Sequence, residues 1–203
     1  MTIFSAAPAT VDPTSGTYRY GQNLTLASAT RSGYDFLGWF TASTGGTQVT
    51  SSTTVTAAAT YWAHWQSSDP WAGCSTTAGQ TCTVAGTVYV RLSDGKLYTK
   101  NPVATSIQWP GTSYSGCPTG THLPTKTEFI NLLVSYGGRT SDGYVTGDGN
   151  TTFRSHTGWD GGYWSATERD SSYAYFLDSH SSYSGVGNYR KTISSNVVCV
   201  VGS

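Results

Sequence analysis

The residues that could perform chemistry in this chain are few and widely spaced. The four histidines, at positions 64, 122, 156 and 180, include no pair with the i, i+4 spacing by which a helix presents two ligands to zinc. Asp178 and His180 lie among many serines, so a Ser-His-Asp triad can be drawn on paper, but such a coincidence has little weight where serine is this common. We therefore predict structural or surface histidines and no catalytic residues.

Calcium is the one cofactor that the sequence leaves open. Asp142-Gly143 and Asp148-Gly149-Asn150, in a predicted loop, could offer oxygen ligands. They lack the dense alternating carboxylates of a calcium loop, and both are also ordinary turn sequences. The Glu-Pro-Asn tripeptide of calcium-dependent sugar-binding lectins does not occur in the chain. We predict no metal and no other cofactor, with calcium as the alternative.

The four cysteines, Cys74, Cys82, Cys117 and Cys199, favour disulfide bonds over thiol chemistry. Their number is even and the chain is rich in Ser and Thr, which favours two disulfides and an oxidising compartment. A catalytic thiol or a zinc site would need an unpaired, activated cysteine or a Cys-x-x-Cys pair, and neither is visible. Four cysteines allow three pairings, which stay open at this point.

The strongest candidate for a binding surface is the segment 171–190. Fourteen of its twenty residues are Ser, Tyr, Gly, Asn or Asp. Tyrosine gives a large contact area at low entropic cost, while Ser, Gly and Asn give adaptable hydrogen bonds, as in antibody binding loops. The tyrosines are interleaved with the serines, so some must face solvent, and exposed tyrosines favour contact with a partner. The alternative is an exposed low-complexity hairpin without a ligand.

We predict a ligand-binding face on this segment and the two residues before it. Phe176 and Asp178 are included because Tyr175 and Leu177, in the opposite phase of the predicted strand, are better core candidates. The predicted ligand-binding residues are Arg169, Asp170, Ser171, Ser172, Tyr173, Phe176, Asp178, His180, Ser182, Tyr183, Asn188 and Tyr189.

The charge balance limits the classes of partner. Eleven basic and eleven acidic residues give a formal net charge of zero, and the basic residues do not cluster, which argues against nucleic acid and anionic membrane surfaces. No apolar run approaches the ~20 residues that span a bilayer, and residues 1–5 lack the basic start and apolar core of a signal peptide. We expect an extracellular or cell-surface protein whose partner is a protein or glycan on another cell or particle.

The elements that must position these residues are mainly strands. One segment, 125–137, predicts a helix, because Thr125 and Glu128 have capping-box spacing and Gly137 suits a left-handed stop. Its apolar residues recur at i, i+3, i+4 and i+7, namely Phe129, Leu132, Leu133 and Tyr136. Strands are predicted at 162–167, 173–178, 189–192 and 196–201, the last being apolar and central in its sheet.

The first 66 residues differ in composition from the rest of the chain, with only four charged residues and no helical periodicity. Short runs between Gly and Ser/Thr turns predict strands at 17–20, 36–40, 53–56 and 61–65. The segment 66–70 ends in Pro and can neither bury surface nor continue a ladder, so we place a domain boundary near residue 68, between domains at 1–67 and 71–203. The expected core residues are Tyr34, Phe36, Trp39, Tyr61 and Trp65, with an aromatic sugar-binding platform as the alternative.

The landmarks of residues 1–66 resemble the internalin B-type surface repeat. They are a Gly-Tyr-Asp-Phe-Leu-Gly-Trp-Phe run at 33–40, a Gly-Gly-Thr turn at 45–47 and a Tyr-Trp-Ala-His-Trp close at 61–65. The usual Asn-Gly-Gly of the first hairpin is replaced by Ala-Ala-Pro-Ala at 6–9. The resemblance implies a small β-grasp-like module that serves as a spacer on bacterial surface proteins.

Three motifs in the second half resemble C-type-lectin-like domains. They are Cys-Pro-Thr-Gly-Thr-His-Leu-Pro-Thr at 117–125, Gly-Tyr-Trp-Ser-Ala-Thr-Glu at 162–168 and Val-Val-Cys-Val at 197–200. Together they are similar to the Fibrobacter-type major paralogous family and the C-terminal domain of collagen-like bacterial adhesins, relatives of the formylglycine-generating-enzyme fold. This chain departs from the family pattern at two positions. It has Thr121 where the family often has Trp, and Val198 where the family often has Arg. The resemblance implies a long-range disulfide between Cys117 and Cys199, which leaves Cys74 and Cys82 to close a local loop.

The place of the tyrosine-rich segment, just before the last strand, resembles the variable proteins of diversity-generating retroelements. The resemblance implies that residues from about 169 to 190 form a hypervariable ligand-binding face. The sequence thus predicts a mainly β, α+β protein: a β-grasp-like repeat followed by a C-type-lectin-like ligand-binding domain, with no enzymatic step. A surface adhesin with a fixed glycan or matrix target is one alternative, and an enzyme of the formylglycine-generating type is another.

Overall fold

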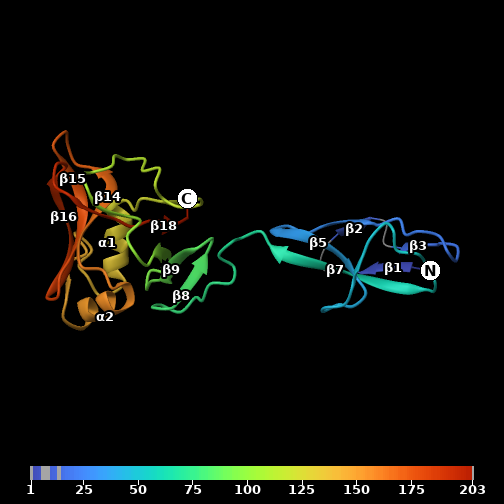
Figure 1. Cartoon of the computed structure of the whole chain (residues 1–203). Helices are drawn as coiled ribbons and strands as arrows, with labels where there is room; N and C mark the ends of the chain where they lie inside the picture. Colours follow the sequence, from blue (N-terminus) through green and yellow to red (C-terminus); the bar gives the residue numbers. More distant parts are fainter. Residues whose placement is uncertain (1, 6–9, 13–14, 203) are drawn as a thin grey trace. The chain divides into compact units, whose positions relative to one another are not determined.

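The computed structural model describes residues 2–5, 10–12 and 15–202, and these form two compact units, Met1–Ala72 and Gly73–Ser203. Figure 1 shows strands in both units and helices in the second. The expected mainly β fold is confirmed, although the described residues contain two helices where the sequence predicted one. The division falls between residues 72 and 73, whereas the sequence placed it near residue 68. Residues 6–9, where the sequence departs from the usual Asn-Gly-Gly of the surface repeat, lie outside the described residues.

The first unit is built on a mixed sheet in the order β3-β1-β7-β5-β6, with β2 and β4 as a separate pair. In this sheet β1 is parallel to β7, while β5 is antiparallel to it. The strands are β1 (Thr2–Ser5), β2 (Thr10–Asp12), β3 (Ser15–Gly16), β4 (Ser28–Thr30), β5 (Tyr34–Phe40), β6 (Gln48–Val49) and β7 (Ala59–Ser67).

Two strands predicted in the first unit do not form. Residues 17–20 contain no strand, and 53–56 contain only an isolated bridge from Thr54 to Asn23. Residues 53–55 exchange only scattered backbone hydrogen bonds with residues 21–24, such as the bond from the Leu24 N–H to the Thr53 carbonyl. Turn-rich sequence of this kind gives a loop held by single hydrogen bonds rather than a continuous ladder.

The core of the first unit surrounds Trp39, which is 1% exposed and donates its indole N–H to the Ala27 carbonyl at 2.8 Å. Tyr61 is also buried, and Trp65 packs against the same cluster. Tyr34 and Phe36 were expected in this core but are exposed. The register of β5 shifts between Phe36 and Gly38, and Phe36 lies at the edge of the cluster, with its ring centroid 5.5 Å from that of Trp39.

The second unit has two sheets with helices between and beside them (Figure 1). One sheet has the order β12-β18-β10-β9-β8 and the other β11-β17-β14-β15-β16-β13. The elements are β8 (Thr81–Val84), β9 (Thr87–Arg91), β10 (Leu97–Thr99), β11 (Ala104–Ile107), β12 (Thr121–His122), α1 (Lys126–Val134), β13 (Val145–Thr146), α2 (Gly147–Thr157), β14 (Gly161–Glu168), β15 (Tyr173–Ser179), β16 (Tyr183–Arg190), β17 (Ser195–Val197) and β18 (Val200–Val201).

Helix α1 forms as its sequence predicted. Thr125 accepts the Glu128 backbone N–H, and the Glu128 carboxylate accepts the Thr125 backbone N–H in return, so the capping box is complete. Gly137 has φ +89°, which is the left-handed conformation expected after the helix. The predicted apolar stripe is buried and meets the sheet: Phe129, Leu132, Leu133 and Tyr136.

Helix α2 was missed, because residues 147–157 carry two glycines, an asparagine and several Ser and Thr, all poor helix formers. Packing overrides this weak propensity. Phe153 is fully buried, and a Cβ on Gly149 would lie 2.1 Å from the Tyr136 carbonyl oxygen, so only glycine permits this approach of α2 to the end of α1. The proposed calcium segment 148–150 is therefore part of a helix rather than a loop.

The strands of the larger sheet hold the predicted binding segment. Strands β14 and β15 lie where the sequence placed them, whereas the strand predicted at 189–192 is displaced: β16 begins at Tyr183 and ends at Arg190. The last apolar run divides into β17 and β18, each inside a different sheet, and Cys199 lies between them. The two expected disulfides are present, Cys74–Cys82 and Cys117–Cys199.

Candidate ligand-binding face

The β15–β16 hairpin has one buried face and one face open to solvent. The strands pair from Tyr173 opposite Arg190 to Ser179 opposite Ser184, so alternate residues point to opposite sides. Leu177 lies in the core cluster that includes α1, and Val186 packs against that cluster. The opposite face carries Asp178 and the tyrosines that follow the turn.

An open pocket of about 170 Å³ lies on this second face. We call it the tyrosine pocket. It is lined by Asp142, Tyr144, Asp178, Tyr183, Gly185, Val186, Gly187 and Tyr189. Three of the twelve predicted ligand-binding residues therefore line one cavity, and a fourth, His180, contacts Asp178 at its side.

The Asp178 carboxylate is the centre of the tyrosine pocket. Its Oδ2 accepts hydrogen bonds from the Tyr183 hydroxyl at 3.2 Å and the Tyr189 hydroxyl at 3.4 Å. His180 Nε2 lies 3.1 Å from its Oδ1. The Asp178 side chain is 14% exposed, and no Lys or Arg nitrogen in the described part of the chain lies within 4.0 Å of it.

The two tyrosines keep their protons near this carboxylate. Burial raises the pKa of Tyr183, and the negative charge of Asp178 raises it further. The same two causes, in the same order, raise the pKa of Tyr189. Both side chains are therefore neutral hydrogen-bond donors at neutral pH, and Asp178 supplies the negative charge among the three.

Tyr144 and Asp142 complete the pocket. The sequence analysis did not include Tyr144 among the binding residues and considered Asp142 only as a calcium ligand. The Tyr144 ring stacks on Tyr183, with centroids 5.4 Å apart, and the Arg139 guanidinium lies 4.7 Å from the Tyr144 centroid. The Tyr144 backbone N–H and the Arg139 guanidinium together lower the pKa of Asp142. The two-residue strand β13 brings Tyr144 here by pairing Val145 with Ser184, and a strand so short leaves no periodic signal in the sequence.

Glycines form the floor of the tyrosine pocket. Gly185 and Gly187 lie on the same face of β16 as Tyr183 and Tyr189, and a side chain at either position would project into the cavity. A Cβ on Gly187 would lie 3.6 Å from the Tyr189 ring, which is an ordinary contact, whereas one on Gly185 would lie 3.3 Å from Tyr144. The space in the pocket therefore depends on the absence of side chains at these positions.

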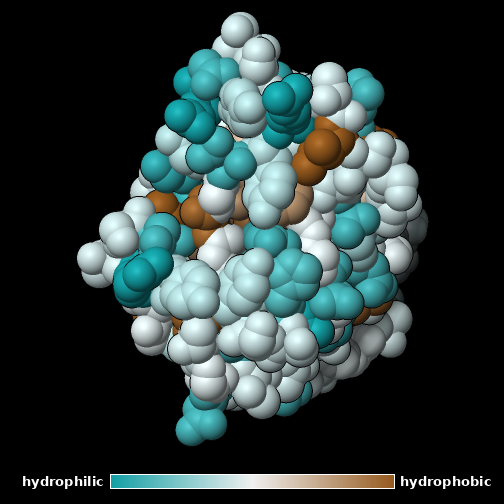
Figure 2. Space-filling view, turned by 90° about the vertical axis from the view of Figure 1, so that its left-hand side faces the viewer, coloured by the Kyte–Doolittle hydropathy of each residue, from teal (hydrophilic) through white to brown (hydrophobic). Residues whose placement is uncertain are grey.

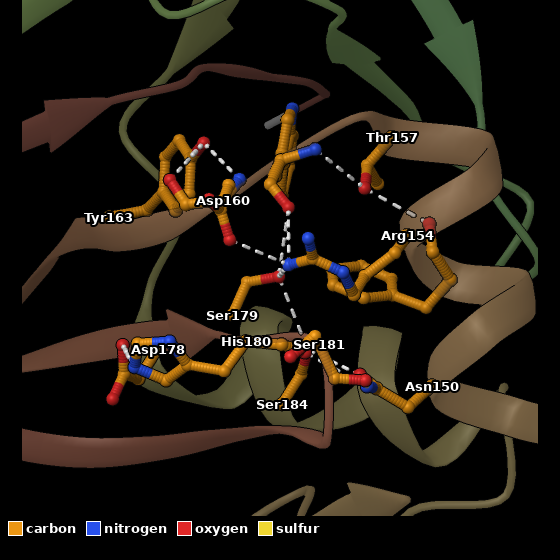
Figure 3. A network of polar contacts seen from close by, with 12 residues as sticks. Asn150, Arg154, Thr157, Asp160, Tyr163, Asp178, Ser179, His180, Ser181 and Ser184 are labelled. Atoms are coloured by element: carbon orange, nitrogen blue, oxygen red, sulfur yellow. Dashed lines mark hydrogen bonds and ion pairs between the residues drawn. The ribbon is translucent and has the colours of Figure 1, made fainter. Parts of the chain in front are cut away.

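A buried polar network fixes the turn that carries the pocket residues (Figure 3). Asn150, 1% exposed, reaches from α2 and donates to the carbonyls of His180 at 3.0 Å and Ser181 at 3.2 Å. The Ser184 hydroxyl donates to the Asn150 Oδ1 at 2.7 Å. Ser179 is also buried and donates to the Trp159 carbonyl at 3.0 Å. These bonds hold both ends of the turn before any ligand arrives.

Phe176 is buried, which corrects its assignment to the open surface. It belongs to a second core cluster with Trp164 and Ala174, and its ring lies over Gly162, where a Cβ would lie 1.9 Å from it. The alternation of side chains along β15 predicted that Phe176 faces solvent. This prediction is wrong because both faces of β15 are covered at this point, one by helices and the other by this second cluster. Tyr175, assigned to the core, is half-buried with Lys126 Nζ 4.1 Å from its centroid.

The other predicted residues lie away from the tyrosine pocket. Tyr173 and Asn188 lie on the opposite face of the hairpin, and Arg169 Nη1 donates to the Asn188 Oδ1 at 2.5 Å. Asp170 accepts the backbone N–H groups of Ser172 and Tyr173, so it orders the β14–β15 turn. Ser171, Ser172 and Ser182 are exposed on the two turns. The hairpin therefore offers two separate polar surfaces, one at each end.

Figure 2 shows the side of the molecule on which β15 and β16 lie in Figure 1. Teal and pale surface covers most of it, and brown apolar surface is confined to small areas. In the described part of the chain no group of three or more His, Cys, Asp or Glu side chains is arranged to hold a metal ion. Asp142, one of the calcium candidates, is instead bonded to Arg139 at 2.6 Å.

Comparison with known proteins identifies the first unit. Residues 3–64 match the Listeria-Bacteroides repeat domain. This match confirms the surface repeat predicted for the start of the chain, and we refer to the first unit as the repeat domain. Neither the search of curated proteins nor that of solved structures found a match. Among the described helices none is long and apolar enough to cross a membrane.

Proposed function

We propose that the second unit is a C-type-lectin-like domain that binds a ligand outside the cell through the tyrosine pocket and the turns beside it. The observation that carries the proposal is the convergence of Tyr183, Tyr189 and His180 on Asp178 above a glycine floor. Rigid aromatic side chains with polar tips, set on a fixed backbone, are suited to recognition without a chemical step.

The lectin-like assignment is supported by the disulfide pattern. Cys117 and Cys199 are bonded to each other, as the resemblance to that family implied. The bond joins the segment before α1 to the segment between β17 and β18, so it closes most of the second unit into one loop. Such a closure suits a domain whose binding surface must keep its shape outside the cell.

The location follows from the same features. The match to the Listeria-Bacteroides repeat domain supports the resemblance of residues 1–66 to bacterial surface repeats, and two disulfides are typical of proteins in oxidising compartments. We infer that the chain is part of a secreted or cell-surface protein, with the repeat domain as a spacer and the second unit as its binding domain.

The binding face is further proposed to be the variable region of a diversity-generating retroelement. The test is to sequence the same locus from many isolates. We expect substitutions at positions on the open face such as Ser182, Tyr183 and Tyr189, at adenine-containing codons between 160 and 196. The buried Ser179 and Ser184 are matched controls, because they are of the same residue type as Ser182 but hold the Asn150 network. Uniform drift over the whole domain would contradict diversification.

Two alternatives have their own tests. A surface adhesin with one fixed glycan or matrix target would show the same pocket residues in every isolate. An enzyme of the formylglycine-generating type needs a free thiol, whereas all four cysteines are in disulfides here. Quantifying thiols in the unreduced, denatured protein decides this point: a free thiol would favour the enzyme.

A further inference from the structure

The tyrosine pocket has the size of a single side-chain end rather than of a whole small molecule. Its volume of about 170 Å³ lies below the roughly 300–1,000 Å³ of cavities that enclose drug-sized ligands. A group that enters it must therefore be small, and the remainder of its molecule must extend over the surrounding surface.

The charge of the pocket is the second constraint. Asp178 is mostly buried, and among the described residues no Lys or Arg pairs with it, His180 Nε2 being the one nitrogen of a basic side chain beside its carboxylate. Asp142, the other acid at the pocket, is already paired with Arg139. A mostly buried carboxylate that has no Lys or Arg partner favours a cation from outside.

The shape of the lining is the third constraint. The Tyr144 and Tyr183 rings stack with only 22° between their planes, and they form an aromatic wall next to the carboxylate. Planar nitrogen groups of the protein itself already contact both the aromatic wall and the carboxylate. The Arg139 guanidinium lies over the Tyr144 ring, and His180 Nε2 lies beside Asp178. The lining contains no Asn or Gln side chain, the amides with which proteins often bind neutral sugars.

We propose that the tyrosine pocket binds the guanidinium group of an arginine side chain on a target protein. A guanidinium is flat, always charged, pairs with carboxylates and stacks on aromatic rings, so it satisfies all three constraints at once. Asp178 receives its N–H groups, the tyrosine rings lie beside its plane, and Gly187 leaves room for its stem. His180, with its side chain 48% exposed, has room to rotate away from Asp178 as the guanidinium enters. This inference rests on the proposed binding function and specifies the ligand of the same site.

The experiment uses the whole chain and small probes. Backbone amide NMR spectra are recorded while Nα-acetyl-arginine amide is added, with Nα-acetyl-citrulline amide as the uncharged probe of the same shape. We expect the Gly185 and Gly187 amide signals to shift with arginine and not with citrulline. Asp178→Asn should weaken arginine binding at least about tenfold, because it removes the charge that faces the guanidinium.

Two further variants separate binding from folding. Gly187→Ala should weaken arginine binding by a similar factor because its methyl group enters the pocket, while its 3.6 Å contact with the Tyr189 ring leaves the fold intact. Asp35→Asn, at an exposed position in the repeat domain, changes the net charge equally and should bind arginine as the parent does.

Three results would overturn the inference. They are equal shifts with citrulline, unchanged binding in Asp178→Asn, or shifts of the same amides with methyl glycosides but not with arginine. The last result would leave a binding face with a glycan ligand, so the proposed function would survive. The comparison of isolates tests the proposed function without any use of arginine, so the two failures are distinguishable.

Discussion

The β5–β7 pair of the repeat domain and the β15–β16 pair of the second unit are both antiparallel and rich in aromatic residues, but they use these residues differently. In the repeat domain Trp39 and Tyr61 turn into the core, and Phe36 packs beside Trp39 at the edge, with ring centroids 5.5 Å apart. In the second unit Tyr183 and Tyr189 turn outward and donate to one carboxylate.

The difference lies in what supports the strands from behind. The β15–β16 turn is held by Asn150 from a separate helix, through hydrogen bonds that are shielded from water. In the repeat domain Gln48 Nε2 also bonds a strand carbonyl, that of Leu37 in β5, but this contact lies on the surface. A hairpin anchored from its buried side can expose its aromatic residues to a ligand, whereas the repeat domain needs its aromatic residues for its own core.

Removing the long-range disulfide should give the largest difference between the two units. The Cys117–Cys199 bond spans 82 residues, so Cys117→Ala/Cys199→Ala should destabilise the second unit by roughly 4–5 kcal/mol on the chain-entropy model. The repeat domain contains no cysteine and should keep its unfolding transition. Calorimetry of the whole chain measures both transitions.

The shorter bond is the matched control for this experiment. Cys74–Cys82 spans 8 residues, and its removal should cost about 2.5 kcal/mol by the same model. Equal losses from the two double variants would mean that loop closure is not the source of the stabilisation. A shift in the repeat-domain transition would show that the two units unfold together.

The parts of the fold that the sequence predicted are those with a local physical signature. The helix at α1 was readable because its capping box and apolar period lie within a dozen residues. Helix α2 was not, because its stability comes from Phe153, Gly149 and Asn150 meeting partners elsewhere in the chain. Long-range packing of this kind leaves no pattern in a short window.

The same distinction applies to the binding face. Among the ligand-binding residues predicted in 171–190, Asp178, Tyr183 and Tyr189 line the tyrosine pocket, whereas Phe176 is buried. Tyr144 arrives from a segment about 40 residues earlier, and only the pairing of β13 with β16 brings it there. Gly185 and Gly187 entered the prediction only as part of the composition of 171–190, and their role as a floor depends on which face of β16 they occupy.

Removal of the Asn150 side chain, which holds the β15–β16 turn, should have the next largest effect on stability. Asn150→Ala leaves the Ser184 hydroxyl and the His180 carbonyl without their partner in a buried site, which should cost about 2–3 kcal/mol. Gln48→Ala in the repeat domain should change stability by less than about 0.5 kcal/mol, because its contact is exposed. Denaturant unfolding measures both values.

Hydrogen exchange tests the structural part of this prediction. In Asn150→Ala the amides of residues 180–184 should exchange faster than those of 173–176, which lie at the other end of the same strand pair. Uniform faster exchange over the whole hairpin would argue that Asn150 stabilises the domain in general and does not position the turn.

Acid should weaken the second unit more than the repeat domain. Burial alone would raise the pKa of Glu128, but hydrogen bonds from Lys96, the Thr125 backbone and His122 outweigh it and lower the pKa to about 2. A carboxyl group with a depressed pKa stabilises the fold above its unfolded pKa, near 4.5, and loses this contribution as the pH falls towards 2. The loss should be on the order of 2 kcal/mol, and Glu128→Gln should flatten the stability profile of the second unit between pH 4.5 and 2.

The smallest effect on stability should come from the pocket residues themselves. Tyr189 is 39% exposed, so Tyr189→Ala should cost about 1 kcal/mol or less, similar to Phe36→Ala at the edge of the repeat-domain core, where Phe36 is 37% exposed. Only the first variant should lose binding of Nα-acetyl-arginine amide. A loss of 3 kcal/mol or more in Tyr189→Ala would show that this ring supports the core, and the two strand pairs would then use their aromatic residues in the same way.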